Sequence, residues 1–247
     1  IAYVQVFEST RGLKPGSKVE FEGHMLEVEL GPGLLSKNFD GLQNDLDKMD
    51  GVFLKRGQYT PALEDDKKWS FTPLAKVGDK VIAGDWLGNV KENWLDHKIM
   101  VPFKFEGEYT VMSVAAAGEY TIKDVIATLK DREGEIHNVM MSQKWPVKLA
   151  VKAYKNKPRP YRLLETGIRV IDTMNPILEG GTGFIPGPFG TGKTVLQHAL
   201  AKNAEADIII MAACGERANE VVVLGQTIGS IYFFTLLFRR LPSHSSR

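Results

Sequence analysis

The residues most able to do chemistry form one glycine-rich run. It reads Gly187-Pro188-Phe189-Gly190-Thr191-Gly192-Lys193-Thr194 and has the spacing G-x-x-x-x-G-K-T. Glycines let a backbone turn with positive φ and approach an anion closely, so that successive N–H groups can surround a phosphate. Lys193 would bring a positive charge to the terminal phosphates, and the Thr194 hydroxyl would hold Mg²⁺. The run, together with Val195, therefore predicts a binding site for Mg²⁺ and ATP or ADP.

The segments on either side of this run are those that a phosphate-binding loop requires. Residues 181–186 predict a short buried strand, and residues 194–201 predict a helix with Val195 and Ala199 facing inward. Leu196 and Leu200 are further candidates for that inward face. A strand, a glycine loop and a helix in this order place a phosphate at a helix N-terminus, where an anion is favoured. This order favours a phosphate-binding loop over a glycine-rich turn without chemical function.

A second candidate for chemistry follows the apolar run at residues 206–213, which predicts a parallel strand buried on both faces. The run leads into Cys214-Gly215-Glu216-Arg217, and reacting groups lie at the carboxyl ends of strands in open α/β sheets. Glu216 is the candidate carboxylate for orienting an attacking water, and Arg217 would balance charge on the phosphates. A surface ion pair is the alternative, but the preceding phosphate loop favours catalysis. Cys214 is interpreted as a packing residue.

The composition limits the classes of partner. The chain has 31 basic and 30 acidic residues and a formal net charge of +1. Such a balance gives no electrostatic basis for binding nucleic acid or an acidic membrane surface. A single cysteine excludes a disulfide framework and favours a reducing compartment. No signal peptide is recognisable, and because the chain opens at Ile1 we expect its natural start to be missing.

The pattern along the chain predicts a mixed β and α/β fold that begins with two β-rich regions. Apolar and polar residues alternate over 1–8, 18–22 and 24–30, and glycine and proline turns separate these stretches. The pattern predicts that residues 1–52 form an incomplete N-terminal β-barrel. Residues 53–143 predict an inserted, barrel-like β-rich domain. Its Gly-Asp turns resemble those of the hammerhead barrel in biotinyl and lipoyl domains. The lysine-bearing hairpin tip of those carriers is absent, so we favour a structural barrel.

The remainder predicts a truncated RecA-like P-loop α/β domain over residues 144–220 and a divergent apolar tail over 221–247. A basic linker, residues 146–162, opens this domain, and we interpret it as a solvated connection rather than a polyanion-binding arm. Thr166 is predicted to cap a short helix over 167–175. For the tail we favour an altered reading frame, a retained intron or an incomplete gene model over a membrane span, because its apolar run is barely long enough to cross a bilayer.

Several motifs together resemble the catalytic A subunit of V-type and A-type rotary ATPases over residues 1–221. They are Gly12–Gly16, Glu29–Leu35, Phe39–Gln43, His97–Pro102, Glu165–Asp172, Gly180-Gly181, the loop Gly187–Thr194 and Cys214–Glu220. The inserted β-rich segment distinguishes this pattern from the F-type β subunit, which is similar but lacks the insertion. The Pro188-Phe189 pair inside the loop is also similar to the V/A type.

The resemblance implies that Lys193 binds the β- and γ-phosphates, that Thr194 assists Mg²⁺, that Glu216 is the catalytic carboxylate and that Arg217 contacts phosphate. It also implies a cytoplasmic position, peripheral on a membrane, in a complex that couples Mg-ATP hydrolysis or synthesis to H⁺ or Na⁺ transport. The implied partners are non-catalytic B subunits in an alternating ring, central stalk subunits and a membrane ion-translocating sector. An arginine finger would come from the B neighbour.

The sequence departs from the family after Glu220, where the Walker B strand, the adenine pocket and a helical domain are expected. We therefore expect this chain by itself to hydrolyse little ATP. Two other functions stay open: a truncated nucleotide-binding or assembly module without turnover, and a RecA-like hexameric nucleic-acid motor. The near-neutral charge disfavours the motor and predicts no nucleic-acid partner.

Overall fold

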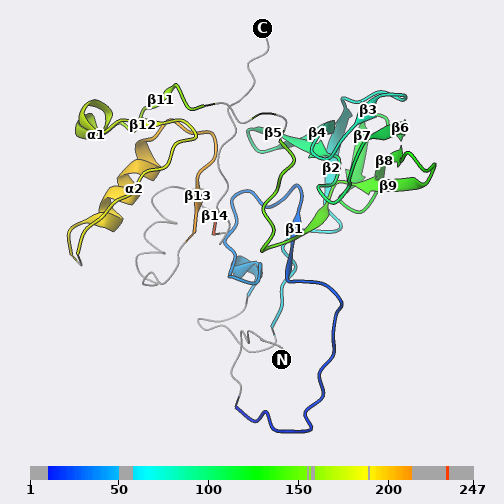
Figure 1. The fold of residues 1–247 in the computed structure, drawn as a ribbon, viewed down its shortest axis with the longest axis horizontal. Helices are drawn as coiled ribbons and strands as arrows, with labels where there is room; N and C mark the ends of the chain where they lie inside the picture. The colour runs from blue at the N-terminus through cyan, green and yellow to red at the C-terminus, as the bar shows by residue number, and fades with distance from the viewer. Residues whose placement is uncertain are drawn as a thin grey trace.

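The computed structural model describes residues 11–49, 58–154, 156, 159–188, 190–212 and 232–233. Figure 1 shows two folded parts, a β-rich lobe with strands β2 to β9 and a smaller part with helices α1 and α2. Strand β1 and the linker after residue 146 lie between them. The strand predicted over residues 1–8 falls outside the described residues.

Strands β2 to β9 form a β-sandwich of two four-stranded antiparallel sheets, ordered β5-β4-β2-β7 and β3-β6-β8-β9. Their bounds are β2 (Lys68–Pro73), β3 (Lys80–Val81), β4 (Trp86–Glu92), β5 (Leu95–Met100), β6 (Tyr109–Val114), β7 (Gly118–Thr121), β8 (Val125–Lys130) and β9 (Ile136–Met140). In β2 the buried Trp69 and Phe71 alternate with solvent-facing residues, which is the period of a strand with one covered face. The predicted β-rich inserted domain is confirmed as a sandwich.

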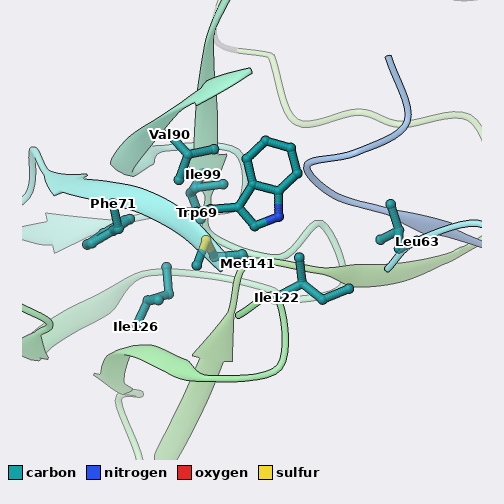
Figure 2. Close-up of a cluster of buried hydrophobic side chains, with 8 residues drawn as sticks. All are labelled: Leu63, Trp69, Phe71, Val90, Ile99, Ile122, Ile126 and Met141. Carbon is teal, nitrogen blue, oxygen red and sulfur yellow. The ribbon is translucent and has the colours of Figure 1, made fainter. Parts of the chain in front are cut away.

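Two clusters of buried apolar side chains form the core of this sandwich. Figure 2 shows the first, in which the Trp69 indole lies beside Val90 and Ile99, with Met141 below it. The second cluster contains Val81, Leu87, Val101, Tyr109, Val111, Ala127, Leu129 and Val139. Each buried aliphatic or aromatic side chain of this size contributes about 1.5–3 kcal/mol relative to exposure. The sandwich is therefore the part of the described chain whose stability rests on apolar burial.

The N-terminal part joins the sandwich through β1 (Glu27–Leu30), which pairs antiparallel with β10 (Gln143–Pro146). The buried Gln43 side chain pairs with the other edge of β1: its Oε1 accepts from Glu29 N at 2.7 Å and its Nε2 donates to Glu29 O at 2.6 Å. The strand predicted over residues 18–22 is wrong. That segment is irregular and exposed, because no described strand lies beside it to complete its backbone hydrogen bonds.

The loop after β1 is held by a buried carboxylate from the sandwich. Glu92, only 3% exposed, accepts hydrogen bonds at Oε1 from the N–H groups of Gly33 at 2.7 Å and Leu35 at 3.2 Å. Its Oε2 accepts from His97 Nδ1 at 2.7 Å. Burial by itself raises the pKa of Glu92, but the His97 bond and charge and the two backbone N–H groups outweigh it and hold the pKa below 4.5. Glu92 is therefore an ionised anchor at neutral pH.

The smaller part contains β11 (Leu163–Leu164), α1 (Arg169–Met174), β12 (Ile177–Leu178), α2 (Lys193–Asn203), β13 (Ile210–Met211) and β14 (Tyr232–Phe233). Strands β11 and β12 pair antiparallel, and β13 and β14 pair parallel. The predicted helices are confirmed. The buried strand predicted over residues 181–186 is wrong: this segment is irregular and mostly exposed, because β12 turns away at residue 179 and no described strand pairs with it.

No helix of the described residues has the length and apolar character needed to span a membrane. The candidate span within the tail, residues 221–238, lies outside the described residues except for β14.

The described residues of the predicted linker, 147–154, 156 and 159–162, form no helix or strand, and Ala153 among them packs on the sandwich at Gly84. Gly78 and Gly84 occupy two similar Gly-Asp turns with left-handed φ values of 94° and 85°. A Cβ at Gly84 would lie 2.9 Å from both Cβ and O of Ala153 in the linker, whereas a Cβ at Gly78 would meet open space. The two turns thus differ in whether the linker covers them.

The Glu92 anchor makes stability depend on pH. A depressed native pKa contributes stability above the unfolded pKa of about 4.3, and this contribution is lost as pH falls through the native pKa. We expect Glu92→Gln to lower the free energy of unfolding by about 1.5–3 kcal/mol at pH 7. Urea titrations from pH 7 to 3.5 should show the gap between the two proteins narrowing below about pH 4.5. Glu119→Gln, at an exposed site on β7, is the control. A difference in the free energy of unfolding between wild type and Glu92→Gln that stays the same at every pH would contradict the anchoring role of Glu92.

The two Gly-Asp turns provide a matched pair for testing linker packing. Alanine at either position places a side chain at a left-handed φ, which costs about 1–2 kcal/mol. Only Gly84→Ala also displaces Ala153, so only this variant should speed trypsin cleavage at Lys152 several-fold. Equal cleavage of Gly78→Ala and Gly84→Ala would show that the linker does not depend on this contact.

Candidate nucleotide-binding site

The glycine-rich loop leads directly into α2. Gly190 and Gly192 have left-handed φ values of 82° and 80°, and Gly192 is the N-cap of the helix. An L-residue adopts these angles only with strain, so glycine at both positions is a requirement of the turn. The turn makes Lys193 the first residue of an 11-residue helix, which places a lysine ammonium and the free N–H groups of a helix start at the same point.

Side chains of the loop bind its own carbonyl groups. The Lys193 ammonium donates to the carbonyl oxygen of Gly187 and, at 2.8 Å, to that of Pro188. The Thr191 hydroxyl donates to the same Pro188 oxygen at 2.8 Å. A Cβ at Gly187 would lie 2.5 Å from Thr191 Oγ1, so this position has no room for a side chain. These contacts bring the two ends of the loop together around Lys193.

Thr194 follows Lys193 in the first turn of α2 and is half-buried. The predicted inward position of Val195 is wrong, since its side chain is 72% exposed. Leu196, Ala199 and Leu200 are half-buried instead. Their spacing of three and four residues places them on one helix face, and Val195 falls outside that face.

Three predicted site residues, Phe189, Glu216 and Arg217, lie outside the described residues, as does Cys214. Their roles stay predictions. Strand β13 precedes Glu216 in the sequence, and its parallel pairing with β14 agrees with the predicted strand type. The predicted burial on both faces is wrong for its described part, because Ile208 and Ile210 are exposed.

Sequence reasoning missed a polar pair that precedes the loop, formed by the buried Thr166 and the half-buried Asp172. Thr166 is fully buried, and both its hydroxyl and its N–H donate to Asp172 Oδ1, at 2.6 and 3.0 Å. The predicted role of Thr166 as the helix cap is wrong: the N-cap of α1 is Ile168, because Gly167, at φ 71°, turns the chain first. The signal available in the sequence was a polar residue and an aspartate on either side of a glycine, within one of the family motifs.

An acidic cluster on the sandwich has a structural explanation. Ligand atoms of Asp131, Glu135 and His137 lie within 4.8 Å of one another. The Asp131 carboxylate is already occupied by the N–H groups of Glu133 and Glu135, at 2.9 and 2.8 Å, and by His137 Nε2 at 3.0 Å. The His137 bond is the main cause that lowers the pKa of Asp131. The cluster closes the β8–β9 hairpin turn, and this accounts for its geometry.

A groove of about 1180 Å³ lies between the sandwich and the linker, lined in part by Gly84, Trp86 and Ala153. It contains none of the predicted nucleotide-binding residues. Its position follows from the packing of the linker on the sandwich.

The fold and the loop define a class of protein: a β-sandwich joined by a linker to an α/β part that carries a phosphate-type glycine loop. Residues 60–148 match the family model described as the ATP synthase alpha/beta subunit barrel-sandwich domain. Residues 167–230 match that of the ATP synthase alpha/beta family nucleotide-binding domain. The chain belongs to the ATP synthase alpha/beta family. The match continues to residue 230, past Glu220, where the sequence by itself gave no alignment.

Comparison with individual relatives gives a closer resemblance. The chain is 50% identical over 224 residues to the V-type ATP synthase alpha chain 1 of Treponema pallidum, covering 90% of this chain and 38% of the relative. It is 52% identical over 221 residues to the alpha chain of Borrelia recurrentis, covering 88% and 38%. The predicted resemblance to the V/A-type alpha subunit is confirmed. The chain spans 38% of the length of these relatives.

Proposed function

We propose that this chain binds Mg-ATP through residues 187–195 and supplies the catalytic nucleotide site of a V-type ATP synthase alpha subunit. One observation carries the proposal: two left-handed glycines end the loop, and Lys193 follows them as the first residue of α2. This arrangement brings a positive charge and free helix N–H groups to one point, which suits a triphosphate. Membership of the ATP synthase alpha/beta family is independent support.

Binding would replace contacts within the loop by contacts to phosphate. The Lys193 ammonium, now shared by the carbonyls of Gly187 and Pro188, would donate to the β- and γ-phosphate oxygens. Mg²⁺ fits the donor set, because it prefers oxygen ligands and Thr194 offers a hydroxyl oxygen beside Lys193. When bound, Mg²⁺ would neutralise charge on the phosphates. Val195, exposed on the outer face of α2, would lie next to this site.

Hydrolysis would need a group that activates water, and Glu216 is the proposed one. Its carboxylate would orient the water and take its proton as the water oxygen bonds to the γ-phosphorus and the bond to ADP breaks. Arg217 would stabilise the charge that shifts onto the phosphate oxygens. Synthesis would run the same steps in reverse.

The proposed setting is a complex in which ATP hydrolysis or synthesis is coupled to H⁺ or Na⁺ movement across a membrane. The partners would be non-catalytic B subunits, which would supply an arginine in trans, together with central stalk subunits and a membrane sector. The relatives are named ATP synthase alpha chains, which supports assembly into such a complex. Binding without turnover is the alternative, and the two measurements below separate it from catalysis.

Lys193→Ala tests the phosphate site. Loss of a charge-assisted hydrogen bond of about 1.5–3 kcal/mol should weaken binding of a fluorescent ATP analogue roughly 10- to 150-fold. Lys202→Ala, in the last turn of the same helix, is the matched control and should bind normally. Unchanged affinity in Lys193→Ala would place the triphosphate elsewhere.

Glu216→Gln tests catalysis in a complete alpha subunit assembled with its partners. Glutamine keeps the shape of the side chain but accepts no proton, so nucleotide binding should persist while turnover falls by about 10²–10⁴-fold. Glu119→Gln, at the exposed site on β7, is the control. The measurement is the rate of phosphate release at saturating Mg-ATP. Near-normal turnover of Glu216→Gln would show that Glu216 is not catalytic and forms only a structural ion pair.

A further inference from the structure

In the α/β part, the fully buried Thr166 side chain makes a hydrogen bond to the half-buried Asp172. Burying a hydroxyl is favourable only when its hydrogen bonds are made, and Thr166 makes several. Its hydroxyl donates to Asp172 Oδ1 at 2.6 Å, and its Oγ1 also accepts from Ile168 N at 3.2 Å. These bonds fix the backbone on both sides of Gly167.

The charge on Asp172 strengthens this arrangement. The Thr166 hydroxyl, and then the Thr166 N–H, hold the pKa of Asp172 below its ordinary value of 3.8. The carboxylate is therefore ionised at neutral pH, and bonds to an ionised acceptor are stronger than neutral ones.

The chain fixed by this pair lies against the far end of the nucleotide helix. We call residues 165–167 the α2 contact segment. Glu205 N donates to Glu165 O at 3.0 Å, just after α2 ends. A Cβ built on Gly167 would lie 3.1 Å from Asn203 Cβ, so the backbone there touches the last residue of the helix. On one side of Thr166 the segment thus contacts the last residue of α2, and on the other side it bonds the backbone just after the helix.

Helix α2 connects this contact to the phosphate loop. It is continuous from Lys193 to Asn203, and an 11-residue helix is roughly 16 Å long. A tilt of about 5° at its last residue would move its first turn by about 1.4 Å. Against the residues that the structure describes, no side chain of α2 is fully buried, so apolar packing there restrains such a tilt less than it would in the sandwich. The close packing of Gly167 on Asn203 and the hydrogen bond from Glu205 N to Glu165 O therefore have a large share in setting its direction.

We propose that Thr166 and Asp172 are positioning residues for nucleotide binding: they hold the α2 contact segment against Asn203 and Glu205, and α2 in turn holds Lys193 and Thr194 at the phosphates. The inference rests on the proposed function of the loop and adds the residues that orient it. Neither residue touches the nucleotide itself.

The test uses the full chain and the affinity for a fluorescent Mg-ATP analogue. Thr166→Val keeps the shape but removes the hydroxyl, and this lowers the fraction of chains with α2 correctly oriented. Apparent affinity should fall roughly 5- to 10-fold, because it scales with that fraction. Thr166→Ser restores the hydroxyl and should restore affinity. Thr173→Val, which removes a hydroxyl that bonds Arg169 O at 2.7 Å on the exposed side of α1, is the control and should bind normally.

A double-mutant cycle separates positioning from general destabilisation. If the pair acts through Lys193, Thr166→Val should change affinity less than two-fold in the Lys193→Ala background. A loss in that background equal to the loss in the wild-type chain would overturn the proposal. If Thr166→Val does not fold, as judged by circular dichroism, Asp172→Asn serves as the milder variant with an expected two- to five-fold loss. Normal affinity in the folded variant would also overturn the proposal.

The Lys193→Ala variant distinguishes this proposal from the proposed function. If Lys193→Ala binds normally, the phosphate site itself is wrong, whatever Thr166→Val does. If Lys193→Ala loses binding while Thr166→Val retains it, the phosphate site stands and the positioning role fails.

Discussion

The arrangement of the N-terminal part depends on one buried charge, the carboxylate of Glu92. A carboxylate without water needs compensation, and here it comes from His97 and from the N–H groups of Gly33 and Leu35. These partners belong to the β4–β5 hairpin and to the loop after β1, so the anchor fixes one against the other. At the tip of the same hairpin, the Trp94 indole N–H donates to Asp207 O at 3.3 Å, just before β13. The hairpin therefore contacts both the N-terminal loop and the α/β part.

The two folded parts of the chain are stabilised by different forces. The sandwich has two clusters of fully buried apolar side chains, whereas α1 and α2 bury none of their residues completely. The described residues of the α/β part instead make directed polar contacts: Thr166 with Asp172, Glu205 with Glu165, and Lys193 with the loop carbonyls. Segments with few apolar contacts open and rearrange at low free-energy cost. In the proposed function, the loop would exchange its internal hydrogen bonds for bonds to a phosphate.

The sequence by itself determined those features that depend on local residue type. The spacing of Gly187, Gly192 and Lys193 predicted a glycine loop at a helix start, because only glycine adopts the required backbone angles without strain. The helix after the loop, the linker and the β-rich insertion were equally predictable from periodicity and turn residues. The family resemblance followed from motifs spread over the chain, and the comparisons confirm it.

Only the tertiary structure decided which segments find partners. Residues 18–22 and 181–186 have the pattern of strands but remain irregular, since a strand forms only where a neighbour accepts its hydrogen bonds. Val195 has an apolar side chain but faces solvent, because the covered face of α2 carries Leu196 and Leu200 and Val195 lies outside that face. The bonds of Glu92 to Gly33 and of Thr166 to Asp172 join residues whose pairing no periodicity encodes. Local propensity determines where helices, turns and loops form. Burial and long-range hydrogen bonds determine which segments and side chains pair, and those interactions exist only once the chain has folded.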